Sequence, residues 1–163
     1  MSITFSADEI FEMAEDIERQ AALFYREAAE KSQDKQIREF LLEMAAMEEG
    51  HDSIFADMRK NLSSQAKQPV TFDPDNQAGQ YLLAMAEAHG TEGKVSTNFK
   101  LTGNESIADI INIGINAERN SVCFYTGLKE LVPSAAGKEQ VDEIIKEELS
   151  HVTILLNKLK TLD

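Results

Sequence analysis

The segment Glu48-Glu49-Gly50-His51 recurs 100 residues later as Glu148-Leu149-Ser150-His151. Each copy contains Glu-x-x-His, a spacing that places a carboxylate and an imidazole on one face of a helix, one turn apart. The same interval separates two upstream pairs: Glu18 and Glu118, and Tyr25 and Tyr125. The stretch 17–25 also aligns with 117–125, with identities at Glu, Arg, Phe and Tyr. These repeats indicate an internal duplication that builds one metal site from four helices.

Apolar residues that recur at alternating spacings of three and four predict four long helices. We expect them at about 7–31, 34–62, 106–132 and 135–160. Ser6 and Glu9 form a capping-box pattern at the first start, and Ser106 with Asp109 resembles another. Short breaks join each consecutive pair into an antiparallel hairpin. The sequence therefore predicts an all-α four-helix bundle in one domain, 1–163, with hairpins at 7–62 and 106–160.

The stretch 63–105 is irregular, with loop signals around a helix-like segment at about 75–89 that stops at Gly90. A connection of this length fits a crossover along the bundle. His89 stands at the end of this minor helix without a partner at ligand spacing. We expect it to be a surface or capping histidine.

The composition excludes several classes of protein. With 42% hydrophobic residues the chain has enough apolar material for a core, and it contains no run of about 18 apolar residues that could span a membrane. The net charge of −13 argues against nucleic acid or an anionic membrane as partner. The first residues lack a basic segment followed by an apolar one, so we expect no signal peptide and a cytoplasmic location.

The single cysteine, Cys123, excludes an internal disulfide and any site that needs a Cys-x-x-Cys pair. It lies in the apolar run 121–125, so we expect a small buried side chain rather than a reactive thiol.

The repeated glutamates and histidines lie on the inward stripes, where an unpaired charge is costly. Four buried carboxylates without a metal would repel one another and could not all ionise. Two divalent cations would balance the four negative charges and leave the histidines neutral. A Glu from each of two helices plus Glu-x-x-His from each of the other two is the arrangement of di-iron and di-manganese carboxylate proteins. The pattern therefore predicts a dinuclear site, with Glu18, Glu48, His51, Glu118, Glu148 and His151 as ligands.

Carboxylates with one imidazole per metal suit iron or manganese. We expect two Fe ions, cycling between Fe2+ and Fe3+, with Mn as an alternative. Glu48 and Glu148 would bridge the metals, Glu18 and Glu118 would be terminal ligands, and each histidine would bind one metal. Six protein ligands leave positions open for water, dioxygen or peroxide.

Tyr25 and Tyr125 lie two turns from Glu18 and Glu118 on the same stripes. A buried phenol needs a hydrogen-bond partner. One interpretation is that each tyrosine donates to a ligand carboxylate across the bundle and serves the reaction, and the other is an ordinary core tyrosine. Glu49 and Glu147 flank the ligands without a match in the repeat, and we expect them at the surface or beside a ligand.

With these residues the chain resembles the ferritin-like superfamily and, within it, the rubrerythrin-like proteins. The resemblance covers nearly the whole chain, including the crossover with its minor helix. It implies a ferritin-like four-helix bundle, a non-haem di-iron site that reacts with peroxide or dioxygen under oxidative stress, and a homodimer.

The chain departs from rubrerythrins in two ways. No cysteine pair is present for a rubredoxin domain, so electrons would come from a separate donor protein. Rubrerythrins also resemble one another in an additional iron-binding glutamate one turn after the ligand of the third helix, where this chain has Ser121. The resemblance therefore supports a di-iron site more strongly than the peroxidase mechanism that uses this glutamate.

The sequence favours an oxidoreductase of the peroxidase or ferroxidase type. The alternatives are an iron-binding or storage protein of the ferritin type, a scaffold with a structural metal, and an enzyme that hydroxylates an organic substrate. The oligomeric state distinguishes a storage protein from the oxidoreductase, because storage requires a large shell.

Overall fold

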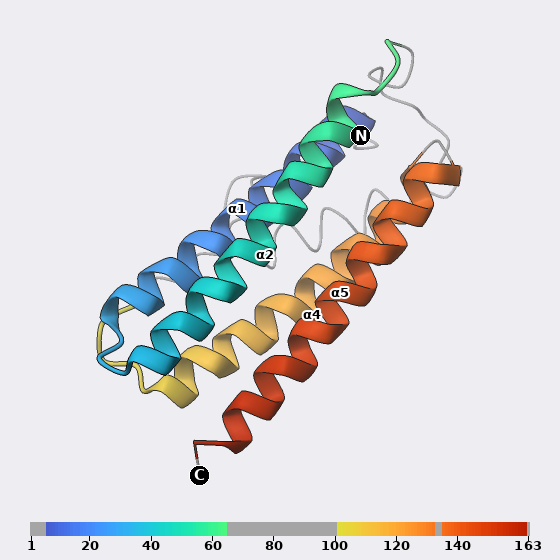
Figure 1. The fold of residues 1–163 in the computed structure, drawn as a ribbon. Helices are drawn as coiled ribbons and strands as arrows, with labels where there is room; N and C mark the ends of the chain where they lie inside the picture. Colours follow the sequence, from blue (N-terminus) through green and yellow to red (C-terminus); the bar gives the residue numbers. More distant parts are fainter. Residues whose placement is uncertain (1–5, 65–100, 133–134, 163) are drawn as a thin grey trace, which may run out of the picture.

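The computed structural model describes residues 6–64, 101–132 and 135–162, which form a ferritin-like four-helix bundle (Figure 1). Its helices are α1 (Ala7–Lys31), α2 (Lys35–Lys60), α4 (Ile107–Leu131) and α5 (Ala135–Lys160). The predicted helices are confirmed, although α2 ends two residues before the expected position. The minor helix expected at 75–89, with His89, lies outside the described residues.

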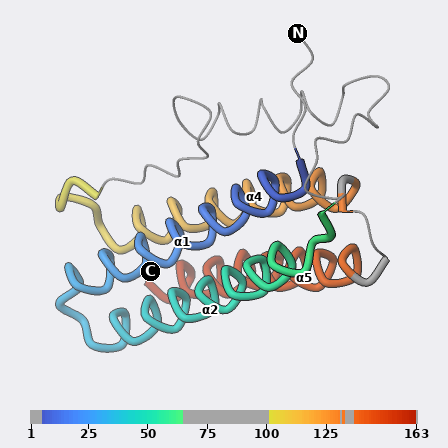
Figure 2. The backbone as a smooth tube through the Cα atoms, turned by 90° about the horizontal axis from the view of Figure 1, so that it is seen from above, coloured from blue at the N-terminus to red at the C-terminus, as the bar shows by residue number. Residues whose placement is uncertain are grey.

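Two antiparallel hairpins pair side by side to make the bundle. Helix α1 packs along α2, and α4 packs along α5. The hairpins meet through α1 with α4 and α2 with α5, which run as neighbours in Figure 2. The end of α2 and the start of α4 lie at opposite ends of the bundle (Figure 1). This topology places the mid-helix residues of all four helices around one axis.

Local capping fixes where the helices begin. The Ser6 hydroxyl accepts a hydrogen bond from the backbone N–H of Glu9, whose carboxylate accepts one in return from the Ser6 backbone. Ser106 and Asp109 form the second predicted capping box in the same way. The Asp34 side chain accepts hydrogen bonds from the first N–H groups of α2. Caps of this kind contribute about 1 kcal/mol each, and they fix the residue at which each of these helices begins.

The inward stripes bury an apolar core on both sides of the polar centre. Toward one end the core contains Phe11, Phe55 and Phe124, and toward the other it contains Leu41, Met44 and Leu155. All of these side chains are at most 2% exposed. The centre of the bundle is therefore closed off from solvent at both ends by large side chains.

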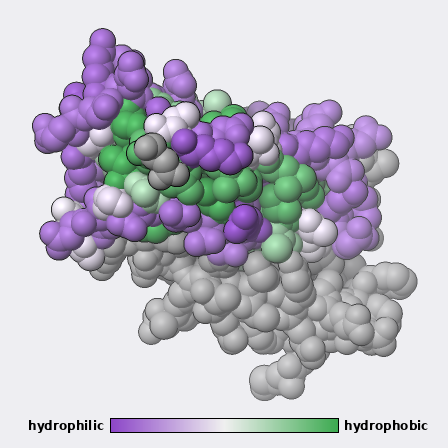
Figure 3. Space-filling model, turned by 90° about the horizontal axis from the view of Figure 1, so that it is seen from below, coloured by the Kyte–Doolittle hydropathy of each residue, from purple (hydrophilic) through white to green (hydrophobic). Residues whose placement is uncertain are grey.

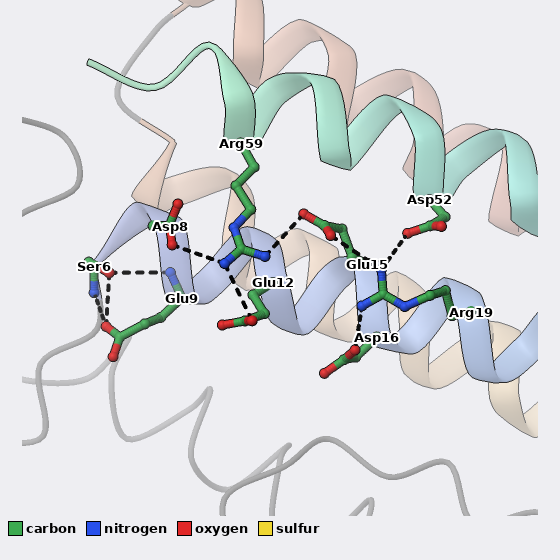
Figure 4. A network of polar contacts seen from close by, with 9 residues as sticks. All are labelled: Ser6, Asp8, Glu9, Glu12, Glu15, Asp16, Arg19, Asp52 and Arg59. Atoms are coloured by element: carbon green, nitrogen blue, oxygen red, sulfur yellow. Dashed lines mark hydrogen bonds and ion pairs between the residues drawn. The ribbon is translucent and has the colours of Figure 1, made fainter. Parts of the chain in front are cut away.

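The outer side of the first hairpin carries a network of ion pairs between α1 and α2 (Figure 4). The Arg19 guanidinium lies 3.1 Å from an Asp52 oxygen, and Arg59 lies 3.0 Å from Asp8. Both arginines also reach Glu15. These contacts tie the two helices together along a solvated face.

The second hairpin has an apolar outer side, where green side chains gather in a band with purple borders in Figure 3. Part of this side is a row of apolar residues on α5, which we call the α5 stripe. Its members are Ile145, Leu149, Val152, Leu156 and Leu159. Leu149 is 51% exposed, and the other four are partly buried. None of the described helices is both long enough and apolar enough to cross a lipid bilayer.

The expectation that Cys123 is buried is wrong, because its side chain is exposed on α4. The apolar run 121–125 is longer than one helical turn, so one of its members must face outward. Leu23, the equivalent residue 100 positions earlier, is also exposed.

Candidate metal centre

All six predicted ligands come together at the middle of the bundle, one or two from each helix. Their exposed fractions are Glu18 1%, Glu48 1%, His51 2%, Glu118 2%, Glu148 0% and His151 4%. Each lies on an inward stripe with apolar residues one turn above and below. The helical period therefore explains why the sequence buries these six polar side chains together.

The first half of the site gathers around His51. Its Nδ1 atom lies 2.8 Å from Glu148 Oε1, 3.5 Å from Glu18 Oε2 and 3.7 Å from Glu48 Oε2. The four residues can each offer one ligand atom within 4.8 Å of the others. This spacing suits a single metal ion.

The second half repeats this geometry around His151. Its Nδ1 atom lies 3.2 Å from Glu48 Oε1, 3.3 Å from Glu148 Oε2 and 3.5 Å from Glu118 Oε2. Glu48 and Glu148 belong to both groups, as expected of bridging carboxylates. The two imidazole rings are stacked, with centroids 5.5 Å apart. The centre is thus a pair of adjoining four-residue groups related by the internal repeat.

Buried ligand atoms at this centre have no hydrogen-bond partner. In the described part of the chain they are Glu48 Oε1, His51 Nδ1, both carboxylate oxygens of Glu148 and His151 Nδ1. Leaving a buried polar atom unpaired costs about 1–3 kcal/mol. These atoms point into the shared centre, so oxygen-binding divalent cations fit the site. Metal ligation by the six residues stays a prediction.

Without metal, the carboxylates of the site have different pKa values. Burial raises the pKa of Glu18 well above its usual value, and the charge of Glu148 adds to this. Burial and the charge of Glu48 raise the pKa of Glu118 in the same way. Burial alone would raise the pKa of Glu148, but His151 and His51 outweigh it and lower the pKa to about 2. The terminal glutamates therefore hold protons more strongly than Glu148.

The histidines respond in the opposite sense to burial. Burial lowers the pKa of an imidazole, but Glu118, Glu148 and Glu48 together raise the pKa of His151 to about 12. Glu148 and Glu18 likewise raise the pKa of His51. Without metal, protons supply the positive charge that the carboxylates require, and a metal ion would replace them.

The two tyrosines cross the bundle to the terminal glutamates. The Tyr25 hydroxyl on α1 donates to Glu118 Oε1 on α4, and the Tyr125 hydroxyl on α4 donates to Glu18 Oε1 on α1. Burial and the charge of the accepting carboxylate raise the pKa of both phenols, so they remain protonated donors. The predicted hydrogen bonds are present, and they link each hairpin to the ligand of the other.

Gly114 gives Tyr25 the room for this hydrogen bond. A Cβ atom at position 114 would lie 2.9 Å from the Tyr25 hydroxyl oxygen and 3.4 Å from Leu155 Cδ1. The equivalent residue in the first hairpin is Ala14, which is fully buried. The sequence places Gly114 on the inward stripe, but only the packing reveals the close contact.

The flanking glutamates differ in their surroundings. Glu147 is 60% exposed, yet its Oε2 lies 2.7 Å from His51 Nε2. Glu49 is 50% exposed and pairs with Arg26 at the surface. Neither residue reaches the central carboxylates, in agreement with the prediction that they lie at the surface or beside a ligand. Ser121 is buried on the inward side of α4, one turn from Glu118.

Glu15 is a buried carboxylate that sequence reasoning missed. It is 7% exposed and lies 3.2 Å from Arg19 and 3.5 Å from Arg59. Arg19 stands four residues later, a common spacing for an ion pair on a helix, and this was the available signal.

Comparisons with known proteins agree with this geometry. A crystal structure of a Thermotoga maritima protein, assigned as a ferritin-like diiron-carboxylate protein, matches with a TM-score of 0.73. The match covers 98% of each chain at 20% identity, which establishes the shared fold. No curated protein matches the chain. The family model described as Rubrerythrin matches residues 9–159. The chain therefore belongs to the rubrerythrin family.

Proposed function

We propose that this protein is a di-iron oxidoreductase that reduces hydrogen peroxide or dioxygen with electrons from a separate donor protein. The observation that carries the proposal is the pair of four-residue groups that share Glu48 and Glu148. Each group offers one imidazole and three carboxylates, the donor set that suits iron. Manganese remains the alternative metal for the same ligands.

The six side chains would hold the two ions as follows. Glu18 and His51 would hold one ion, Glu118 and His151 would hold the other, and Glu48 and Glu148 would be shared by both ions. When bound, two irons would supply the two-electron redox chemistry, with the electrons coming from the donor protein. For peroxide, two electrons and two protons break the O–O bond and release two waters.

The tyrosines have a supporting role in this proposal. Each phenol donates to the outer oxygen of a terminal glutamate, which leaves the other oxygen of that carboxylate free for a metal. The hydrogen bond orients the carboxylate and keeps a proton at a defined atom beside the site. The large apolar residues on both sides limit the entry of bulk water.

We further propose that the protein acts as a cytoplasmic homodimer, with the α5 stripe as the contact. In an acidic chain, two copies can approach closely only through a surface without like charges. The five residues of the α5 stripe carry no charge, and Leu149 is half-exposed on it. The cytoplasmic location is supported by a different observation. The chain has a single cysteine, so it forms no internal disulfide that would require an oxidising compartment.

Stopped-flow spectroscopy of the iron-loaded ferrous protein tests the reaction. We expect an absorbance change on mixing with peroxide or dioxygen, and multiple turnovers when a reductant is present. Glu143→Ala, a change at an exposed residue of α5, should leave the reaction intact, whereas Glu148→Ala should abolish it. An iron-loaded protein that is inert to both oxidants would contradict the proposal, and elution as a large shell would favour storage instead.

A further inference from the structure

The two histidines of the metal centre have different partners on their outer nitrogens. His51 Nε2 lies 2.7 Å from Glu147 Oε2, while its Nδ1 faces the central carboxylates. In the described part of the chain, every carboxylate within 4.0 Å of His151 lies near its Nδ1. Among the described residues, the imidazole of the first half therefore has a carboxylate at both nitrogens, and that of the second half has carboxylates at Nδ1 alone.

The internal repeat explains this difference. Glu147 on α5 contacts His51 on α2. In the other half of the repeat, the equivalent contact would join residue 47 on α2 to His151 on α5. Residue 47 is methionine, 40% exposed, and it cannot accept a strong hydrogen bond from an imidazole N–H. The difference between Glu147 and Met47 thus makes the surroundings of the two histidines unequal.

A carboxylate on the outer nitrogen changes what a histidine offers to a metal. It accepts the Nε2–H hydrogen bond, which fixes the tautomer with the lone pair on Nδ1 and holds the ring in place. It also raises the basicity of the ligating nitrogen. His51 is prepared in this way for a metal at the Glu18 side.

We propose that Glu147 is a positioning residue that makes the position formed by Glu18 and His51 the tighter of the two metal positions. This inference rests on the proposed di-iron function, since it assigns an order to the same two ions. The first Fe²⁺ to bind occupies the His51 position, and the second occupies the His151 position with lower affinity.

The inference is tested by an anaerobic calorimetric titration, in which Fe²⁺ is added to the metal-free protein and the heat of each addition is measured. The unmodified protein should show two resolved binding steps. Glu147→Met, which copies the residue of the other half, should weaken the first step by about 10–100-fold, the usual effect of losing such a partner. Glu147→Gln keeps an acceptor oxygen without the charge and should show a smaller loss.

The reciprocal change separates this role from a structural one. Met47→Glu supplies His151 with the missing carboxylate and should strengthen the second step, which a mere loss of packing could not do. Glu143→Gln, at an exposed position one turn before Glu147, should leave both steps unchanged. Thermal melting of each metal-free variant verifies that it folds.

The outcomes distinguish the two proposals. Two bound Fe²⁺ ions with affinities that Glu147→Met leaves within about twofold, well below the effect expected for such a partner, would overturn the role of Glu147 alone. An unmodified protein that binds fewer than two Fe²⁺ ions would overturn the di-iron proposal as well.

Discussion

The first hairpin, α1 with α2, and the second hairpin, α4 with α5, share their inner faces but not their outer ones. Inside, the repeat preserves every predicted ligand, both tyrosines and the crossed hydrogen bonds from tyrosine to glutamate. The stacked imidazoles follow the same symmetry. In the proposed di-iron site, two metal ions would place the same demand on both halves, which would account for this likeness.

The outer faces differ in the ion pairs that join their two helices. The first hairpin carries the cross-helix ion pairs Arg19 with Asp52, Arg26 with Glu49, and Arg59 with Asp8. In the second hairpin, the residues equivalent to these three pairs stand 100 positions later. In the same order they are Arg119 with Val152, Thr126 with Leu149, and Leu159 with Ala108. Exposed ion pairs contribute about 0–1 kcal/mol each, so their loss is tolerable for the fold. Four of these six residues are apolar, which suits a face that a partner covers.

The largest effect is expected from removing a carboxylate that both halves share. Glu48→Ala and Glu148→Ala should each reduce the iron content from about two ions per chain to one or fewer. Metal analysis after anaerobic reconstitution measures this, with Glu49→Ala as the matched exposed control. If one of the two variants kept both ions, the halves of the site would not be equivalent.

The second effect concerns the outer faces. Leu149→Glu combined with Val152→Asp copies the first hairpin onto the second, and it would place like charges opposite one another in a dimer. Since such contacts cost several kcal/mol, we expect the dimer affinity to fall by more than about 100-fold.

Size-exclusion chromatography with light scattering checks this expectation. Leu23→Glu, at a 65% exposed apolar residue of the first hairpin, should leave the dimer intact. A monomeric unmodified protein, or a double variant that remains dimeric, would show that the α5 stripe is not the contact.

The third effect is the pH dependence of metal binding. Glu18, Glu118 and both histidines have raised pKa values in the metal-free protein, so protons and metal compete for these groups. Affinity should therefore rise with pH, by about tenfold per pH unit for each proton that a metal displaces.

Calorimetry in buffers of different ionisation enthalpy counts the protons released. His51→Ala and His151→Ala should each lower that number, because each half contributes its own protonated groups. Metal binding that is independent of pH between 5.5 and 7.5 would contradict the proton-for-metal exchange.

The smallest effect distinguishes the two tyrosine environments. Gly114→Ala brings a methyl group against the Tyr25 hydroxyl, whereas Ala14 is already accommodated in the first hairpin. Overpacking costs about 1–3 kcal/mol and the gain in helix propensity returns about 1, so we expect a net loss of about 1 kcal/mol.

Chemical denaturation of the metal-free variants measures this loss. In a Tyr25→Phe background the hydroxyl is absent, and the cost of Gly114→Ala should shrink. An unchanged cost in that background would mean that the strain lies against the ring carbon Cε1 of residue 25, at 3.3 Å, or against Leu155 Cδ1, at 3.4 Å, instead.

Much of this molecule could be predicted from the sequence because its information is periodic. The positions at which α1, α2 and α4 begin follow from local capping by Ser6, Asp34 and Ser106. The burial of Glu18 and its counterparts follows from their place among apolar residues at helical spacing. The exposure of Cys123 was mispredicted because an apolar run around a full turn does not say which residue faces outward.

The sequence by itself determined the four described helices, the two hairpins and the set of six inward polar side chains predicted as ligands, since these depend on short-range periodicity and on a repeat of constant interval. Only the tertiary structure decided that Tyr25 reaches Glu118, that Glu147 reaches His51 and that Gly114 makes room for a phenol. Those contacts join side chains on different helices. Their distances depend on how the hairpins pack, which no local pattern in the chain specifies.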